Sequence, residues 1–544
     1  MSRRAKQWPI VLGVVAGLAI AAGVAALALR DGGNGGATLM RSSEYIEGVA
    51  GAPQRVNPVY ASLNEVDQDL VQLVFSGLVK LSADGQVEPD LAELPEIGDG
   101  GKTYTFKIRK DARWQDGEPL TSRDVAFTIG LLTDPGFKGD PLLAAAWLEV
   151  GVETPEPQTV VLKLQQPSAP FLARNATLGI LPEHLLAGTS ADALWTATFN
   201  TRPVGTGPYR LESLDSREAV LVANKDYHLG RPLIETIRLR FFTDYPSALR
   251  AATGGQIDGL MVRDTLTEAE LTEIDKLKGK KTEELQRSAL VILYLNNDQA
   301  AFFQDERVRR AISLALDRKQ IVQSAFLGLA TPSSSPIAPG SWSYAQEYDH
   351  TEVNIAQAKQ LLKDAGWNPS PTTGILVREG GEFRFTIRVD NDPVRMAIAS
   401  EVARQLDPLG IKATVASTTF SVLRRDFLQE RKYDAAIAGW DQGADPDPYF
   451  GWHSSQMGTA GLNLANFADI VADSLISQGR TSQDIEVRKD AYRQFQEVWA
   501  ELEPSVVLAY PRYIYVHPDS LEGVPEGVVF SPSLRFADVH KWRN

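Results

Sequence analysis

The sequence contains no cysteine and few of the other residues that carry metal or redox chemistry. Its 544 residues include no Cys, 5 Met and 6 His. Without thiols the chain has no disulfides, iron–sulfur clusters, zinc knuckles or cysteine nucleophiles, nor a cysteine for lipid attachment. The histidines are scattered, and none lies three or four residues from another: His184, His228, His350, His453, His517 and His540. We therefore expect no metal site.

Basic runs are also absent after the first six residues. The chain has 55 Lys and Arg against 69 Asp and Glu, which gives a formal net charge of -14. A surface of this sign repels phosphate backbones, so we do not expect a nucleic-acid partner. With 43% hydrophobic and 23% charged residues the composition is that of a globular protein. At ~150 residues per domain, the length suggests roughly three or four folding units.

The usual enzyme signatures are missing. The sequence has no G-x-S-x-G elbow, no Walker A loop and no H-E-x-x-H pair. Gly205-Thr206-Gly207 resembles the start of a dinucleotide fingerprint, but Pro208 follows and no third glycine completes it, so a turn is expected. Asp445-Pro446-Asp447 lacks the further acidic residue and the glycine of a calcium loop. We expect no catalytic residues and no cofactor.

One long apolar run is present, at residues 10–29. Its twenty residues carry no polar side chain and are long enough, as a helix, to cross the ~30 Å hydrocarbon core. The basic segment before it predicts that the N-terminus stays in the cytoplasm and that the rest of the chain is exported. Two interpretations stay open, an uncleaved anchor or a signal cleaved near the small residues 26–28. The glycine-rich residues 31–36 are typical of a flexible tether.

Hydrophobic periodicity predicts a mixed α/β protein. The first half is rich in strands, and Tyr104, Phe106 and Ile108 alternate as one strand face. The second half alternates strands and helices, which favours a lobe with a partly parallel sheet. In that half we expect strands at 291–295, 383–389, 411–415 and 433–438, and helices at 306–327, 355–365, 394–409 and 420–428. A last strand beginning near Val506 would rejoin the first lobe and make that lobe discontinuous.

Several short motifs occur in a characteristic order between about residue 44 and residue 516. They are Val56-Asn57-Pro58, Leu78-Val79, Glu88-Pro89-Asp90-Leu91-Ala92, Trp114-Gln115-Asp116-Gly117, Gly205-Thr206-Gly207-Pro208-Tyr209, Gly255-Gln256-Ile257-Asp258, Arg307-Val308-Arg309-Arg310-Ala311-Ile312, Ala315-Leu316-Asp317-Arg318, Ala365-Gly366-Trp367, Tyr433-Asp434, Gly439-Trp440, Asp445-Pro446 and Trp452-His453-Ser454-Ser455. In this ordered set the chain resembles the extracellular solute-binding proteins of peptide ABC importers, the oligopeptide/dipeptide-binding family (bacterial extracellular solute-binding family 5).

The resemblance implies the two-lobed α/β fold of periplasmic binding proteins, the Venus-flytrap fold, with an extra small domain inserted in the first lobe. The expected division has a cytoplasmic basic segment (1–7), a transmembrane anchor or signal (8–30), a Gly-rich linker (31–41), the first part of lobe I (42–77), the inserted small domain (78–200), the second part of lobe I (201–288), lobe II (289–504) and return strands of lobe I (505–544).

The resemblance also implies capture of a solute and not catalysis. An extracytoplasmic protein of this family, monomeric and either anchored or free in the periplasm or at the cell surface, would bind oligopeptides or dipeptides between its lobes. It would then deliver them to an ABC-type permease. The alternatives are a non-peptide solute on the same fold (nickel complex, sugar or opine), a membrane-tethered peptide sensor, and an envelope hydrolase using a carboxylate pair.

The resemblance places the ligand cleft at the loop after Gly439. In peptide-binding members an aspartate three residues after the tryptophan binds the peptide amine, but here that position is Gly443. Asp441 or Asp445 would supply the charge instead, and Trp440 would form a pocket wall. The other cleft candidates lie in loops or at strand ends: Asn296, Asn297, Trp342, Asn57 and Tyr60.

Overall fold

The computed structural model describes residues 44–263, 266–459 and 461–544. The predicted basic segment, membrane or signal segment and linker at residues 1–41 lie outside these ranges. Within the described ranges, no helix combines the length and the apolar character that crossing a membrane requires.

Among the described residues, one 12-stranded sheet runs through both lobes in the order β19-β18-β20-β13-β21-β11-β1-β10-β9-β8, with β12 and β14 also paired to β21. Its strands are β1 (Glu44–Ala50), β8 (Tyr209–Leu214), β9 (Glu218–Ala223), β10 (Thr236–Phe242), β11 (Gly259–Val262), β12 (Lys280–Gln286), β13 (Ala289–Leu295), β14 (Ala330–Pro332), β18 (Arg384–Asp390), β19 (Lys412–Thr418), β20 (Ala435–Asp441) and β21 (Ser505–Pro518). We call the part built on β1 and β8–β12 the first lobe, and the part built on β13 and β18–β20 the second lobe.

The second lobe is a three-layer α/β/α structure. Strands β18, β19 and β20 are parallel, whereas β13 is antiparallel to both neighbours. Alternate residues of β13 enter different cores, with Leu293 in the core under α10–α13 and Ile292 in the core under α16 and α17. The helices are α10 (Glu306–Ala315), α11 (Arg318–Phe326), α12 (Ile355–Asp364), α13 (Pro393–Leu406), α14 (Phe420–Val422), α15 (Tyr449–Trp452), α16 (Ile470–Thr481) and α17 (Ile485–Leu502).

The first lobe carries a smaller, separate sheet. This four-stranded sheet has the order β4-β5-β7-β6 and lies within the expected inserted domain. Its strands are β4 (Glu96–Gly98), β5 (Thr103–Lys107), β6 (Gly151–Glu156) and β7 (Thr159–Lys163). The remaining short strands, outside this sheet, are β2 (Val79–Leu81), β3 (Val87–Pro89), β15 (Asn368–Pro369), β16 (Leu376–Arg378) and β17 (Gly381–Glu382). The first-lobe helices are α2 (Glu65–Val74), α3 (Ser122–Thr133), α4 (Pro141–Ala145), α5 (Phe171–Arg174), α6 (Glu183–Leu186), α7 (Ala191–Leu194), α8 (Tyr245–Thr253) and α9 (Glu268–Asp275).

The helix predicted over residues 306–327 is divided into α10 and α11. Leu316 between them is extended, with φ -90° and ψ 117°. The Asp317 carboxylate then accepts a 3.0 Å hydrogen bond from the Gln320 N–H and caps a new helix. The apolar spacing continues across this break, which is why periodicity alone did not reveal it.

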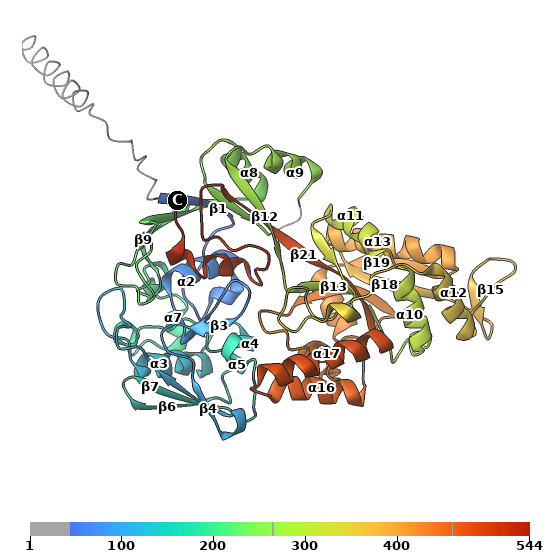
Figure 1. Ribbon diagram of the computed structural model, residues 1–544, viewed down its shortest axis with the longest axis horizontal. Coiled ribbons are helices and arrows are strands. Elements are labelled where there is room, and N and C mark those ends of the chain that lie inside the picture. The colour runs from blue at the N-terminus through green and yellow to red at the C-terminus, as the bar shows by residue number, and fades with distance from the viewer. Residues whose placement is uncertain (1–43, 264–265, 460) are drawn as a thin grey trace, which may run out of the picture. The chain divides into compact units, whose positions relative to one another are not determined.

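Strand β21 joins the two lobes (Figure 1). Its first half pairs with β13 and its second half with β11 and β12. The chain also crosses between the lobes at Arg287 and Ser288, which link β12 to β13. The second half of β21 thus pairs within the first lobe, and two neighbouring crossings connect the lobes.

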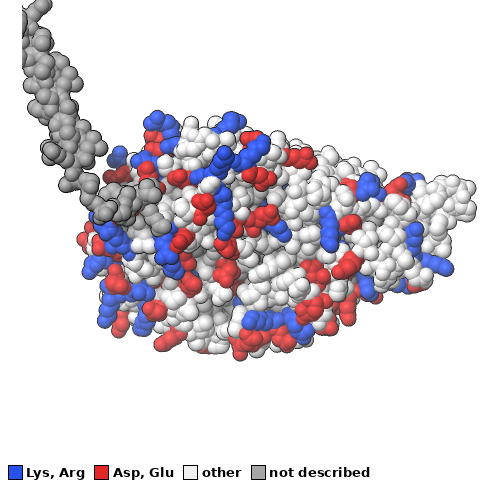
Figure 2. All heavy atoms as spheres, turned by 45° about the horizontal axis from the view of Figure 1, so that its top comes forward, with Lys and Arg blue, Asp and Glu red and all other residues white. Residues whose placement is uncertain are grey.

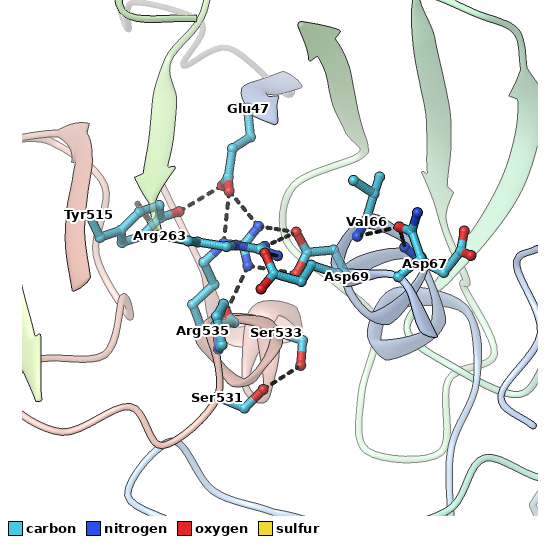
Figure 3. Close-up of polar contacts among 12 residues, drawn as sticks. Glu47, Val66, Asp67, Asp69, Arg263, Tyr515, Ser531, Ser533 and Arg535 are labelled. Carbon is cyan, nitrogen blue, oxygen red and sulfur yellow. Dashed lines mark hydrogen bonds and ion pairs between the residues drawn. The ribbon is translucent and has the colours of Figure 1, made fainter. Parts of the chain in front are cut away.

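A cluster of fully buried charges stabilises the first lobe (Figure 3). The side chains of Glu47, Asp69 and Arg535 are 0% exposed. The Arg535 guanidinium donates to both oxygens of Asp69, each at 2.8 Å, and lies 2.6 Å from Glu47. Tyr515 donates a 2.9 Å hydrogen bond to Glu47, and Arg263 pairs with Asp69. Burial alone would raise the pKa of Asp69, but Arg263 and Arg535 hold it below its usual range.

Removal of this buried arginine should be strongly destabilising. Arg535→Met leaves two carboxylates buried without their counter-charge, so we expect the free energy of unfolding to fall by about 3–5 kcal/mol. Urea denaturation measures the loss. Arg543→Met is the matched control, because Arg543 pairs with Glu522 at 2.6 Å on the surface and should cost less than about 1 kcal/mol. Equal losses of unfolding free energy in the two variants would contradict the stabilising role assigned to Arg535 in the buried cluster.

Candidate functional site

A cavity of about 560 Å³ lies beside the two crossings. The first lobe lines it with Val262 and Arg263 at the end of β11, and the shared strand β21 contributes Pro511, Arg512 and Ile514. The second lobe lines it with residues from β13, α11, α13 and β20, together with neighbouring loops. The cavity is therefore an interlobe site.

The second-lobe wall is formed where parallel strands end. β18 ends at Asp390, β19 is followed by Phe420, and β20 ends at Asp441, and all three residues line the cavity. Open α/β sheets bind ligands at the carboxyl ends of their parallel strands, because backbone groups and loop side chains converge there. The sheet topology thus explains why the site is on this edge.

Three of the predicted site residues lie together in the cavity wall. Gly439, Trp440 and Asp441 are consecutive at the end of β20. A Cβ on Gly439 would lie 2.1 Å from the carbonyl oxygen of Leu290, so only glycine permits this approach to β13. The Trp440 Nε1 atom is buried without a hydrogen-bond partner. Asp441 is exposed and accepts hydrogen bonds from the Ser288 hydroxyl and, at 2.9 Å, from the Gly443 N–H.

Asp445 and Trp342 lie outside the cavity lining. Asp445 is buried and accepts hydrogen bonds of 2.8 and 3.0 Å from the Arg488 guanidinium. Burial alone would lower the pKa of Arg488, but Asp445 raises it well above its usual range. Trp342 covers the same arginine, with the guanidinium carbon 4.8 Å from its ring centre. These residues form a compact ion-pair site behind the loop.

The four remaining candidates make internal hydrogen bonds away from the lining. Asn296 and Asn297 follow the far end of β13, about 20 Å along the strand from its cavity end at Ala289. Both amides donate to backbone carbonyls there. In the first lobe, Asn57 donates to Asn200 at 2.9 Å and the Tyr60 hydroxyl donates to the Ala191 carbonyl at 3.2 Å.

Charged residues that sequence reasoning did not single out also line the cavity. They are Arg263, Arg287, Asp390, Asp392, Arg395 and Arg512. Arg395 contacts both oxygens of Asp390 at 2.7 Å, and these hydrogen bonds raise the pKa of Arg395. Asp392 caps α13. The signal that would have found this group is the position of Asp390 directly after a predicted strand of the parallel sheet.

A second contact joins the lobes beyond the cavity. The Ala169 N–H donates a 2.9 Å hydrogen bond to the Arg480 carbonyl, and Arg174 of α5 lies 3.5 Å from Asp447. Arg174 also lies over Phe450, with 5.3 Å between the guanidinium carbon and the ring centre. The segment of the first lobe that holds α5 therefore contacts the loop that follows the candidate site.

The geometry suits binding of a solute. The cavity combines aromatic side chains of the second lobe with aliphatic and charged side chains from both lobes. The described residues contain no cluster of three or more acidic or histidine ligands able to hold a metal ion. A cavity between two α/β lobes connected by strands defines the class of two-lobed binding proteins.

Comparisons with known proteins identify the family. The model of bacterial extracellular solute-binding proteins, family 5, matches residues 86–461. The chain is 30% identical over 511 residues to the oligopeptide-binding protein AppA of Bacillus subtilis, and the match covers 92% of each chain. The chain belongs to the bacterial extracellular solute-binding proteins of family 5, whose members bind solutes outside the cytoplasm.

Solved structures agree with this assignment. AppA from Bacillus subtilis in complex with a nonapeptide has a TM-score of 0.68 at 28% identity, covering 92% of this chain and 99% of that one. NikZ from Campylobacter jejuni in complex with Ni(L-His) has a TM-score of 0.69 at 23% identity, covering 93% and 100%. The second likeness shows the shared fold. The expected two-lobed fold is thereby confirmed.

The two candidate aspartates should respond differently to substitution. Asp445→Ala leaves the Arg488 guanidinium buried without its partner, so the free energy of unfolding should fall by about 3–5 kcal/mol. Asp441→Ala removes an exposed carboxylate and should change the free energy of unfolding by less than about 1 kcal/mol. Urea denaturation of both variants measures the difference. An Asp445→Ala variant as stable as the unmodified protein would show that the ion pair with Arg488 does not stabilise the fold.

Proposed function

We propose that the protein captures oligopeptides or dipeptides in the interlobe cavity and delivers them to an ABC-type permease. The observation that carries this proposal is the cavity itself, which is lined by both lobes at the carboxyl ends of β18 and β20. Its volume of about 560 Å³ is within the range typical of small-ligand sites. The likeness to AppA in complex with a nonapeptide supports a peptide as the solute.

Ligand capture would favour a closed arrangement of the lobes. A solute that contacts Ile514 on one side and Trp440 on the other makes contacts that an open form lacks. The solute then shifts the population from the open to the closed form, by as much as its affinity for the closed form exceeds its affinity for the open form. A permease that recognises the closed form would accept the loaded protein over the empty one.

We propose binding without catalysis. The three aspartates of the described lining are already engaged, because Asp390 pairs with Arg395, Asp392 caps α13, and Asp441 accepts from Ser288 and Gly443. A hydrolase with a carboxylate pair needs one acid and one base free to reach the reacting bond. This lining supplies neither.

A non-peptide solute is the second candidate. Gly443, with φ +72°, stands where peptide-binding relatives were expected to carry the amine-binding aspartate. NikZ, which was solved with Ni(L-His), shares the fold. A nickel complex, a sugar or an opine therefore belongs in any ligand screen. A membrane-tethered peptide sensor is the further alternative for a peptide-binding protein of this fold.

The placement of the protein in the cell is a further part of the proposal. We propose that residues 8–30 export the chain and either anchor it to the membrane or are cleaved, so that the described domain works as a monomer outside the cytoplasm. The division at residues 42–77, 78–200, 201–288, 289–504 and 505–544 is proposed with it. It is supported by the separate small sheet and by the two crossings near Arg287 and Pro511.

Trp440 should contribute directly to binding. Isothermal titration of the full-length protein with peptides of two to nine residues should show binding, and Trp440→Ala should weaken it at least tenfold, about 1.4 kcal/mol, because an aromatic wall is lost. Trp342→Ala is the matched control and should change the Kd less than about twofold, since Trp342 lies outside the lining.

Titration with Ni(L-His), sugars and opines completes the test. If one of these binds and no peptide does, the peptide proposal fails while the family assignment stands. If Trp342→Ala weakens peptide binding as much as Trp440→Ala, this cavity is not the binding site.

A further inference from the structure

Most charges that line the cavity are compensated within the protein. Three of the lining arginines form ion pairs: Arg263 with Asp69, Arg395 with Asp390, and Arg512 with Glu284. The lining aspartates are engaged as described above. On the outer face drawn in Figure 2, acidic and basic side chains are interspersed in the same way. A lining charge without a partner is therefore informative.

Arg287 is such a charge. Among the described residues it forms no ion pair within 4.0 Å, and its Nε is buried without a hydrogen-bond partner. The guanidinium carbon lies 4.3 Å from the centre of the Tyr513 ring. Burial raises the pKa of Tyr513 to about 12; Arg287 acts to lower it, and Asp441, which accepts from Ser288 and Gly443, acts to raise it, so the phenol is neutral and supplies no counter-charge.

The surroundings of Arg287 leave room for a strong additional interaction. A cation over an aromatic face is stabilised only modestly, which only partly offsets the cost of a buried N–H with no acceptor. A carboxylate can accept two parallel hydrogen bonds from a guanidinium and also supplies the missing charge. Arg287 lies on the link between β12 and β13, so a group bound to it would contact the chain where it passes between the lobes.

We propose that Arg287 binds a carboxylate of the captured solute. This inference rests on the proposed function and adds the chemical group that the cavity selects. In a peptide the carboxylate is either the C-terminus or an acidic side chain. A neutral solute, or a peptide blocked at every carboxylate, would leave Arg287 uncompensated and would bind more weakly.

The experiment compares three alanine-based probes with the full-length protein by isothermal titration, each at lengths of three and six residues. One has a free C-terminus, the second is its C-terminal amide, and the third is an amide that contains one glutamate. We expect the protein to prefer the free acid, or the glutamate-containing amide, at least tenfold over the plain amide. Arg287→Gln should abolish that preference, and Arg287→Lys should retain part of it.

Arg388→Gln is the matched control. The Arg388 guanidinium carbon also lies 4.3 Å from an aromatic ring centre, that of Phe427, but Arg388 is not part of the cavity lining. This variant should keep the full preference for a carboxylate. The unliganded melting temperature of each variant shows whether it is folded.

The outcomes separate the inference from the function on which it rests. Peptide binding with equal affinity for acid and amide, or a preference that survives in folded Arg287→Gln, would overturn the role of Arg287 and leave peptide capture intact. If no probe of either length binds, peptide capture and this inference fall together. A preference carried only by the glutamate-containing amide would support Arg287 and place an acidic side chain there.

Discussion

Strand β21 is the constraint on which both lobes depend. It supplies alternate side chains to all four hydrophobic cores of the described chain: Val506 and Leu508, Val507 and Tyr510, Tyr513 and Tyr515, and Ile514 and Val516. Burial of each such side chain contributes roughly 1.5–3 kcal/mol, so the strand is fixed firmly at both ends. Along β21, any bending between the lobes then falls on the short crossing between these ends.

The crossing is also where the hydrogen-bond ladder is least continuous. Pro511 has no N–H to donate, and the register between β13 and β21 shifts at Val291 and Ile292. The cavity opens at this point, with Pro511, Arg512 and Arg287 in its wall. A ligand in the proposed site would therefore lie against the part of the chain that bends when the lobes move, and occupancy would be coupled to lobe geometry.

Sequence patterns predicted the architecture well because the patterns and the fold depend on the same local physics. Apolar spacing indicated the α/β second lobe, and the alternating apolar stretch after Val506 indicated the returning strand. Gly439 to Asp441 were expected in the cleft from the motif around Trp440, and they do line the cavity. Fold class and one wall of the site were thus accessible from residues alone.

The rest of the site depends on contacts between distant residues. Asp445 is a plausible ligand contact in the sequence, but its carboxylate meets Arg488, 43 residues further along the chain. Asn296 is polar and follows a strand, yet it follows the end away from the cavity. Arg287 had no motif to mark it, and its importance appears only once Tyr513 and the missing counter-charge are seen together.

The buried charge cluster of the first lobe has a consequence for how the chain matures. Asp69 and Glu47 are made near the beginning, whereas Arg535, which neutralises them, is 466 and 488 residues away. Nascent chains therefore cannot complete this core until almost the last residues have been synthesised. Contacts of such long sequence separation form slowly, and a chain that crosses the membrane as it is made would remain loosely folded until its C-terminal end arrives. The order of residues along the polypeptide thus delays completion of the first-lobe core until synthesis is nearly finished.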